Sequence, residues 1–472
     1  MIAKPMQQVR LQRIIARTDN TALNLGTAAA LFLGSTAMVY YAAIEQSRTI
    51  IVCYVAMGVL GWLLANRKGD FSGRIFICIY GFSAFAAVVL ALEFVKQHGV
   101  PYWAGGSDEL AYEEAAIAFA QNSRALDYGG IRGTLVTEWH NSVGYIYLVG
   151  LMAIASGWVD GFHTMVPRLF NIVCLALVAV QVYHISRQLK LRESTALAAG
   201  LIAGVIPLMV WVSIQTLRDI IMGLLLVTLI HLWLPDRTGR WRYSTFLMIV
   251  LSALLVVPMW EMRRPTAFSA MFLMAFAILS NRRSFTIVQT ILFTAPLLIA
   301  SAFFIAQYAG VLTSDLSLQV EGVQEYSEYR LGSDIGGGLS RIVFATNIFP
   351  IGWLLRCAYA LITPIPVAFA SLDQTWLSIG TMIHIVFLPF FWRGCVTSIK
   401  SATWGLPLVA FAMLFLGMAI FTFTVRHISQ YLPFAIILTA KGFESYNGDR
   451  SRPLLITASI AALLGVAYIV IK

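Results

Sequence analysis

The sequence predicts an all-α protein, a bundle of about 13 to 15 transmembrane segments that forms one domain over residues 1–472. Of its 472 residues, 59% are hydrophobic and only 12% are charged, and the mean hydropathy is +0.77. A soluble domain needs more polar surface than this composition supplies. Apolar runs of about 20 residues, the length that a helix needs to cross a bilayer, recur along the chain. We therefore expect a polytopic helical membrane protein.

About 13 apolar runs are long enough to be spans. They cover residues 23–45, 49–65, 73–95, 165–187, 194–213, 217–235, 243–260, 265–280, 285–308, 376–392, 402–423, 428–440 and 453–471. Two further runs, 142–158 and 344–371, would move neighbouring basic clusters to the outer side if each spanned once. They either span or enter the membrane and return, which is tolerated where the backbone lines a cavity. Pro350, Pro364 and Pro366 favour a broken helix in the second run.

Basic residues gather in the short segments between the runs and indicate the cytoplasmic side. These residues are Arg67, Lys68, Arg74, Arg187, Lys190, Arg192, Arg237, Arg240, Arg242, Arg282, Arg283, Arg393, Lys400, Lys441, Arg450 and Arg452. The basic N-terminal head has no cleavage site after its first apolar run, so we expect it to stay in the cytoplasm. This topology predicts a multi-pass protein of the cytoplasmic (inner) membrane, with two long loops, 96–141 and 309–343, on the periplasmic or extracytoplasmic face.

The net charge of +10 does not predict a nucleic-acid partner. The cations lie beside apolar runs, and the sequence has no basic helix interleaved with aromatic residues. The five cysteines lie within or at the ends of apolar runs, without the spacing of metal ligands. We interpret them as packing residues and expect no disulfide or metal framework.

The first outer loop contains a short acidic helix. Ser107 has the character of an N-cap, Asp108 and Glu109 occupy the first turn, and the helix is expected to run to about Asn122. Tyr112 lies one turn on and shares the face of these acids. Helix capping explains the acids without any chemistry. A carboxylate at the membrane surface is equally suited to act as a general base on a sugar hydroxyl.

Aromatic residues of this loop are candidate contacts for a sugar. Tyr112 and Trp139 offer flat apolar faces, and His140 follows Trp139 in the chain. Such rings suit stacking on a sugar, although aromatic belts at the membrane interface are the ordinary explanation.

Basic residues also occur at outer ends of the predicted spans, against the usual charge bias. These candidates, with the acid and the histidine beside them, are Arg168, Arg218, Asp219, Arg263, Arg264, Arg426 and His427. The planar fork of arginine suits a phosphate or pyrophosphate at the headgroup level. Local ion pairs, such as Arg218 with Asp219 or Glu261 with Arg264, and contacts with lipid headgroups are the alternatives. Four separate cationic sites on one face with an acidic loop favour the phosphate interpretation.

The second outer loop, 309–343, contains several acids and the triplet Gly336-Gly337-Gly338. Its middle has the pattern of a short amphipathic helix, and the glycines that of a hinge. It is either a mobile cover over a site or a solvated connector. The triplet is not a phosphate-binding motif, because no strand precedes it and no Lys-Ser/Thr pair follows.

Three passages between about residues 73 and 235 carry a family resemblance. The first is Gly106-Ser107-Asp108-Glu109-Leu110-Ala111-Tyr112, the second starts at Pro167-Arg168-Leu169-Phe170-Asn171, and the third runs from Pro207 to Asp219. In this order they resemble the GT-C superfamily of integral-membrane glycosyltransferases, which includes the protein O-mannosyltransferases and the aminoarabinose transferase of lipid A. Two spans precede the usual first helix of that family, and Glu138-Trp139-His140-Asn141 replaces its His-Pro-Pro-like segment.

The resemblance implies a fold of GT-C type and a mechanism. A polyprenyl-phosphate-linked sugar lies in the membrane lipid of the outer leaflet, with its phosphate held by arginines. Asp108 or Glu109 deprotonates a hydroxyl of a glycan, lipid or protein acceptor, which attacks the anomeric carbon in one displacement with inversion. The arginines stabilise the leaving phosphate. No cofactor is required; some family members use a divalent cation (Mg or Mn), and nothing in this sequence demands one.

Other functions remain open at the level of the sequence. Arg426-His427 and Gln430-Tyr431-Leu432-Pro433 are similar to segments of polysaccharide polymerases from surface-glycan clusters, so an O-antigen or exopolysaccharide polymerase or ligase is the nearest alternative. A transporter or flippase of lipid-linked glycans would favour internal repeats and polar groups at the membrane midplane. We find no repeat, and the charges cluster at span ends. A scaffold or assembly factor is the third alternative.

Overall fold

The described part of the protein is entirely helical. The computed structural model describes residues 3–67, 69–103, 107–124, 142–235, 243–280, 351–361, 369, 371–399, 401–421 and 425–471. Within these ranges it contains sixteen α-helices, one 3₁₀ turn and no strand, which confirms the predicted all-α class. The second outer loop, 309–343, and the apolar run 285–308 lie outside the described residues.

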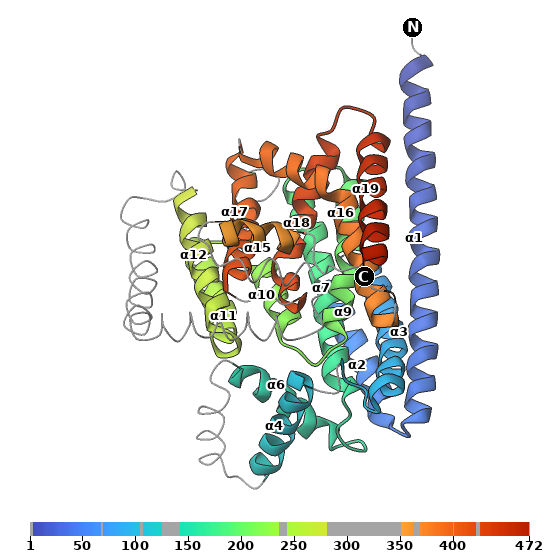
Figure 1. Ribbon diagram of the computed structural model, residues 1–472, viewed down its shortest axis with the longest axis vertical. Helices are drawn as coiled ribbons and strands as arrows, with labels where there is room; N and C mark the ends of the chain where they lie inside the picture. Colours follow the sequence, from blue (N-terminus) through green and yellow to red (C-terminus); the bar gives the residue numbers. More distant parts are fainter. Residues whose placement is uncertain are drawn as a thin grey trace.

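The helices follow one another with short connections in most of the chain (Figure 1). They are α1 (Ala3–Ile44), α2 (Arg48–Ala65), α3 (Ser72–His98), α4 (Ser107–Arg124), α6 (Val143–Ser156), α7 (Met165–Gln188), α8 (Glu193–Val205), α9 (Pro207–Ser213), α10 (Asp219–Leu232), α11 (Thr245–Met262), α12 (Arg264–Ser280), α15 (Ile351–Leu361), α16 (Leu372–Ile399), α17 (Ala402–Phe421), the 3₁₀ turn η4 (Val425–His427), α18 (Ile428–Glu444) and α19 (Ser451–Ile471).

Five helices are long and apolar enough to cross a membrane: α1 from Thr21 onward, α2, α3, α7 and α16. The pair α8 and α9 passes the same test if it is one span, bent by 49° at the break before Pro207. Proline suits this place, because the first position of a helix needs no backbone N–H. The described residues thus contain about five candidate spans, or six with the bent pair. The larger predicted number stays a prediction.

The run 142–158 forms α6, which has only 14 residues. A helix of about 20 residues is needed to cross the hydrocarbon core directly. This length favours the interfacial or re-entrant interpretation of the run over a full span. In Figure 1, α6 lies beside α4 at the lower end of the molecule.

Small residues allow the helices to pack closely. A Cβ built on Gly442 of α18 would lie 1.7 Å from the carbonyl oxygen of Phe390, and one on Gly394 of α16 would lie 1.8 Å from that of Leu438. Only glycine fits such a contact between backbones, and small residues at helix interfaces are typical of membrane bundles. The contact fixes α16 against α18.

Several of the basic residues predicted to be cytoplasmic lie at one end of the bundle. There the backbone N–H of Arg192 donates to Glu444 at 2.9 Å, and the Arg393 guanidinium donates to the Ser445 carbonyl at 2.7 Å. The predicted cytoplasmic residues Arg187, Lys190 and Lys441 lie in the same region, on α7, its C-terminal turn and α18. We call this the basic end. The helices α7, α10 and α18 begin at the other end, near α4.

Candidate functional site

Helix α4 presents two adjoining faces of acidic residues to the bundle. Asp108 and Tyr112 are four residues apart and share one face, as the sequence predicts. Glu109 and Glu113 share the next face. Because residues four apart lie one above the other on a helix, each face brings two side chains to the same neighbours. The two faces contact different groups of residues.

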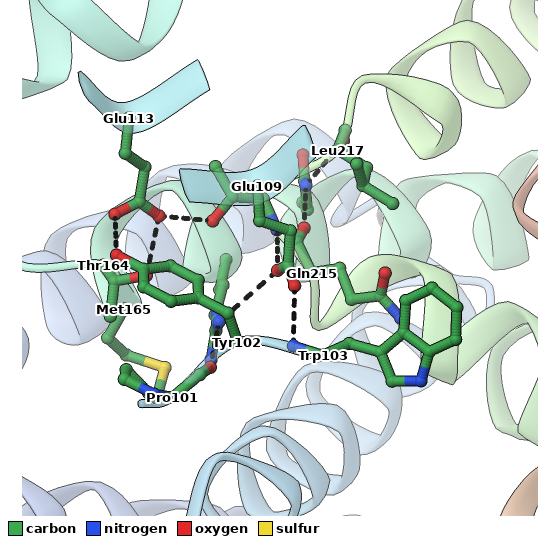
Figure 2. A network of polar contacts seen from close by, with 12 residues as sticks. Pro101, Tyr102, Trp103, Glu109, Glu113, Thr164, Met165, Gln215 and Leu217 are labelled. Atoms are coloured by element: carbon green, nitrogen blue, oxygen red, sulfur yellow. Dashed lines mark hydrogen bonds and ion pairs between the residues drawn. The ribbon is translucent and has the colours of Figure 1, made fainter. Parts of the chain in front are cut away.

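The Glu109–Glu113 face packs into a buried network, which we call the Glu113 network (Figure 2). It consists of Tyr102, Trp103, Glu109, Glu113, Thr164, Arg168 and Thr216. One carboxylate oxygen of Glu113 accepts hydrogen bonds from the hydroxyls of Thr164 and Thr216, both at 2.6 Å. Its other oxygen accepts from the Tyr102 hydroxyl at 2.8 Å. Burial raises the pKa of Tyr102, so its hydroxyl stays protonated and donates.

The carboxylate oxygens of Glu109 already have partners, which are two backbone N–H groups and one guanidinium. Its oxygens accept from the backbone N–H groups of Thr216 at 2.9 Å and Trp103 at 3.0 Å. The Nη2 atom of Arg168 lies 3.4 Å from Glu109. The Glu109 side chain is only 3% exposed. Burial raises the pKa of Glu109, and Arg168 with the two N–H donors opposes this shift.

Arg168 lies inside the protein near the N-terminal end of α7. It donates to the Pro101 carbonyl and its guanidinium lies 5.7 Å from the centre of the Tyr102 ring. Its side chain is 1% exposed. Arg168 therefore ties the segment before α4 to α7, rather than opening to a surface.

Asn171 of α7 holds the linker before α10 in place. The Asn171 amide donates to the carbonyls of Gln215 at 2.7 Å and Leu217 at 2.8 Å. Gln215 and Leu217 are labelled in Figure 2. Their contacts with Asn171 fix the segment that carries Thr216, a member of the Glu113 network, and Arg218, a member of the second group of residues.

The Asp108–Tyr112 face meets the second group, which we call the arginine cluster. It consists of Asp108, Arg218, Asp219, Arg263, Arg426 and His427. Asp108 accepts a hydrogen bond from Arg426, a residue 318 positions later. Both side chains reach the surface, since 50% of the Asp108 side chain and 29% of the Arg426 side chain are exposed. Solvent or a substrate can therefore reach this ion pair.

Asp219 is the buried centre of the cluster. Arg263 donates to its carboxylate at 2.7 Å and lies 2.6 Å from Nε2 of His427. Asp219 also experiences the positive charges of Arg426 and Arg218. The Gln430 amide approaches the same oxygen at 3.4 Å. One buried carboxylate thus gathers three guanidinium groups.

Arg218 joins the cluster to α4. It donates to the Ser142 hydroxyl, which lies 3.2 Å from the Tyr112 hydroxyl, and its guanidinium lies 6.0 Å from the centre of the Tyr112 ring. With Asp108 and Asp219 as its acids, the arginine cluster has three guanidinium groups for two carboxylates. This excess favours an anion beside Asp108.

Among the described candidates, Arg264 does not enter the arginine cluster. It starts α12, and its guanidinium lies 5.8 Å from the centre of the Trp260 ring. Trp139 and His140 lie outside the described residues, so their predicted substrate contacts stay predictions.

Among the described residues, no group of three or more His, Cys, Asp or Glu side chains is arranged to hold a metal ion. A divalent cation bridged by substrate stays an open expectation.

Several residues of the site were not among the candidates from the sequence. Glu113 had a signal, because it follows Glu109 by four residues on a helix that was predicted correctly. Asn171 and Thr216 lie in two of the passages that carry the family resemblance. Ser142 and Thr164 have no signal in the sequence, since hydroxyl residues are common and their partners are distant along the chain.

Comparisons with known proteins give no assignment for the chain. No protein-family model, no curated protein and no solved structure matches it. The chemistry of the site must therefore be argued from its own residues.

Proposed function

We propose that this protein is a membrane glycosyltransferase of GT-C type. It moves a sugar from a polyprenyl-phosphate or polyprenyl-pyrophosphate donor to a hydroxyl of a glycan, lipid or protein acceptor, with inversion at the anomeric carbon. The reaction takes place on the outer face of the cytoplasmic membrane. The chain crosses that membrane many times, with the 13 to 15 segments that the sequence predicts.

The observation that carries the proposal is the half-exposed pair of Asp108 with Arg426. Arg218 and Arg263 lie beside it around Asp219, at the end of the bundle away from the basic clusters. A carboxylate that can reach a hydroxyl and guanidiniums that can hold a phosphate are thereby neighbours. These are the two groups that a single displacement from a lipid phosphate requires.

The pair gives the donor a direct way to activate the base. When the donor phosphate binds Arg426, it competes with Asp108 for the same guanidinium. Asp108 is then free to take the proton of the acceptor hydroxyl. The acceptor oxygen forms its bond to the anomeric carbon while the bond from that carbon to the phosphate oxygen breaks. The electron pair leaves with the lipid phosphate, whose charge the arginines stabilise.

Asp108 is a better candidate for the base than Glu109. The Glu109 carboxylate is buried, and its oxygens are already bound to two backbone N–H groups and Arg168. A general base must reach the proton that it removes. In this proposal Glu109 and Arg168 position α4, and the predicted catalytic role of Glu109 stays an alternative for the test.

The test is a comparison of lipid extracts from a deletion strain complemented with different variants. We expect the deletion to accumulate a lipid-linked glycan, and the wild-type gene to remove it. Asp108→Asn should behave like the deletion although the protein is inserted at normal levels. Glu114→Gln changes an exposed acid of the same helix and should restore the wild-type extract.

Full turnover by Asp108→Asn would exclude Asp108 as the base. Loss of turnover in Glu109→Gln with a normally folded protein would then move the role to Glu109. An unchanged extract in the deletion strain would reject glycosyl transfer itself. The length of the product separates single transfer, which adds one sugar, from polymerisation, which gives a ladder of repeat units.

A further inference from the structure

A cavity of about 340 Å³ lies at the basic end of the bundle, away from the arginine cluster. The C-terminal ends of α7, α10 and α16, the first turn of α17 and the last turns of α18 surround it. Its volume falls within the range of small-molecule sites, roughly 300–1,000 Å³. Five elements from distant parts of the chain thus form one concave site that the proposed reaction does not use.

The ionisable side chains among the described residues that line the cavity are both lysines. Lys190 and Lys441 line it, and none of the described residues that line it is acidic. Lys441 is held by Trp404, with its ammonium 4.9 Å from the centre of the ring. Lys190 has a φ of +65°, a left-handed conformation that is uncommon for lysine. Two cations around one cavity without an acid favour an anionic ligand.

Hydrogen-bond donors at the start of α17 point to the same class of ligand. The hydroxyls of Ser401 and Thr403 both line the cavity and lie 3.2 Å apart. One hydroxyl donates to the other, so one O–H of this pair is left for a further acceptor. The first turn of α17 also begins here, with the positive end of its helix dipole.

Stabilisation of helix ends explains only part of this arrangement. Lysines near the C-terminal ends of α7 and α18 favour those helices by themselves. That effect accounts for the position of each cation, but not for a hydroxyl pair and a helix N-terminus across a shared cavity.

We infer that this cavity binds a phosphate group, either the headgroup phosphate of an anionic lipid or free inorganic phosphate. Lys190 and Lys441 supply the charge, and Thr403 with Ser401 supplies the hydroxyl donor. The ligand would join the ends of α7, α10, α16, α17 and α18.

The experiment uses the purified full chain in neutral detergent. Its thermal unfolding is followed with added phosphatidylglycerol against phosphatidylcholine, and with inorganic phosphate against chloride at equal ionic strength. We expect phosphatidylglycerol or phosphate to raise the unfolding temperature of the wild type. In Lys190→Gln/Lys441→Gln the apparent affinity should fall by about tenfold or more, which is ~1.4 kcal/mol. Lys96→Gln, an exposed lysine on α3, is the matched control and should bind as the wild type does.

A second variant keeps the test decisive if the double variant does not fold. Thr403→Asp places a negative charge on an exposed residue of the cavity and should abolish the effect without disturbing buried packing. Stabilisation by the lipid alone identifies a headgroup, and stabilisation by phosphate alone identifies a soluble ligand. Equal unfolding shifts for Thr403→Asp and wild type, or no shift in the wild type with either probe, would overturn the inference.

Discussion

At the level of single residues, Asp108 and Glu109 are neighbours in the chain with opposite environments. Successive residues of a helix point about 100° apart, so Asp108 reaches the exposed pair with Arg426 and Glu109 enters the buried Glu113 network. The sequence placed both acids in the first turn but did not separate their roles.

Glu113→Ala should lower the free energy of unfolding by about 3 kcal/mol. The change leaves the buried hydroxyls of Thr164 and Thr216 and the half-buried hydroxyl of Tyr102 without their acceptor, and each unsatisfied buried group costs about 1–3 kcal/mol. Chemical or thermal unfolding in detergent measures the loss. Glu114→Ala removes an exposed acid of the same helix and should change stability little. Equal effects of the two substitutions would contradict a structural role for Glu113.

The free energy of unfolding of the wild type, measured relative to that of Glu109→Gln, should fall as the pH rises. Burial places the pKa of Glu109 above its ordinary value of 4.5, so the folded protein holds this proton more tightly than the unfolded chain does. The contribution is complete below about pH 4.5 and is lost as the pH passes the folded pKa. Unfolding temperatures of both proteins between pH 4.5 and 8 test this, and parallel curves would disprove it.

Arg218→Ala should weaken binding of a polyprenyl phosphate by about tenfold, ~1.4 kcal/mol, since it removes one of three guanidiniums around the proposed phosphate position. The measurement is a binding titration with the lipid phosphate in detergent. Arg264→Ala is the matched control, because Arg264 lies over Trp260 and outside the arginine cluster. Unchanged affinity in Arg218→Ala would limit that residue to a structural role, which includes its contacts with Ser142 and Tyr112.

At the level of elements, close helix packing depends on single glycines. Gly442→Ala should destabilise the protein by about 3 kcal/mol, because its Cβ would lie 1.7 Å from a backbone oxygen of α16 and the helices would have to separate. Gly405→Ala is the comparison within α17, where the nearest atom is 3.9 Å from the added Cβ. Helix propensity makes that substitution neutral or slightly stabilising. Unfolding in detergent compares the two, and similar midpoints would reject the contact between α16 and α18.

At the level of the whole molecule, the proposed topology puts α4 and the loop after α18 on opposite sides of the membrane. In a chain whose five native cysteines are replaced, Glu114→Cys should react with an impermeant maleimide added outside intact cells. Arg450→Cys should react only after permeabilisation. Glu114 is exposed and Arg450 is partly exposed. Labelling of both from the same side would overturn the topology and with it the outward-facing reaction.

A feature could be predicted from the sequence when the interactions that produce it join residues that are close along the chain. The sequence predicts Ser107 as the N-cap of α4 and an end near Asn122; in the structure the helix starts at Ser107 itself and ends at Arg124, both within two residues of the prediction. These features are local, because capping and helical spacing involve residues within one or two turns. By contrast, a local pair of Arg218 with Asp219 was only an alternative at the level of the sequence. In the structure Asp219 accepts a hydrogen bond from Arg263, 44 residues away, and Arg218 is one of the further charges that act on it.

The sequence by itself determined the helical class, the apolar character of the long helices and the presence of cations at the ends of the predicted spans. Composition and periodicity suffice for these, since each residue contributes independently of its partners. Only the tertiary structure decided that Asp108 meets Arg426 across 318 residues, that Glu109 is buried, and that α6 has 14 residues. Such contacts depend on how helices pack against one another, which no local pattern encodes.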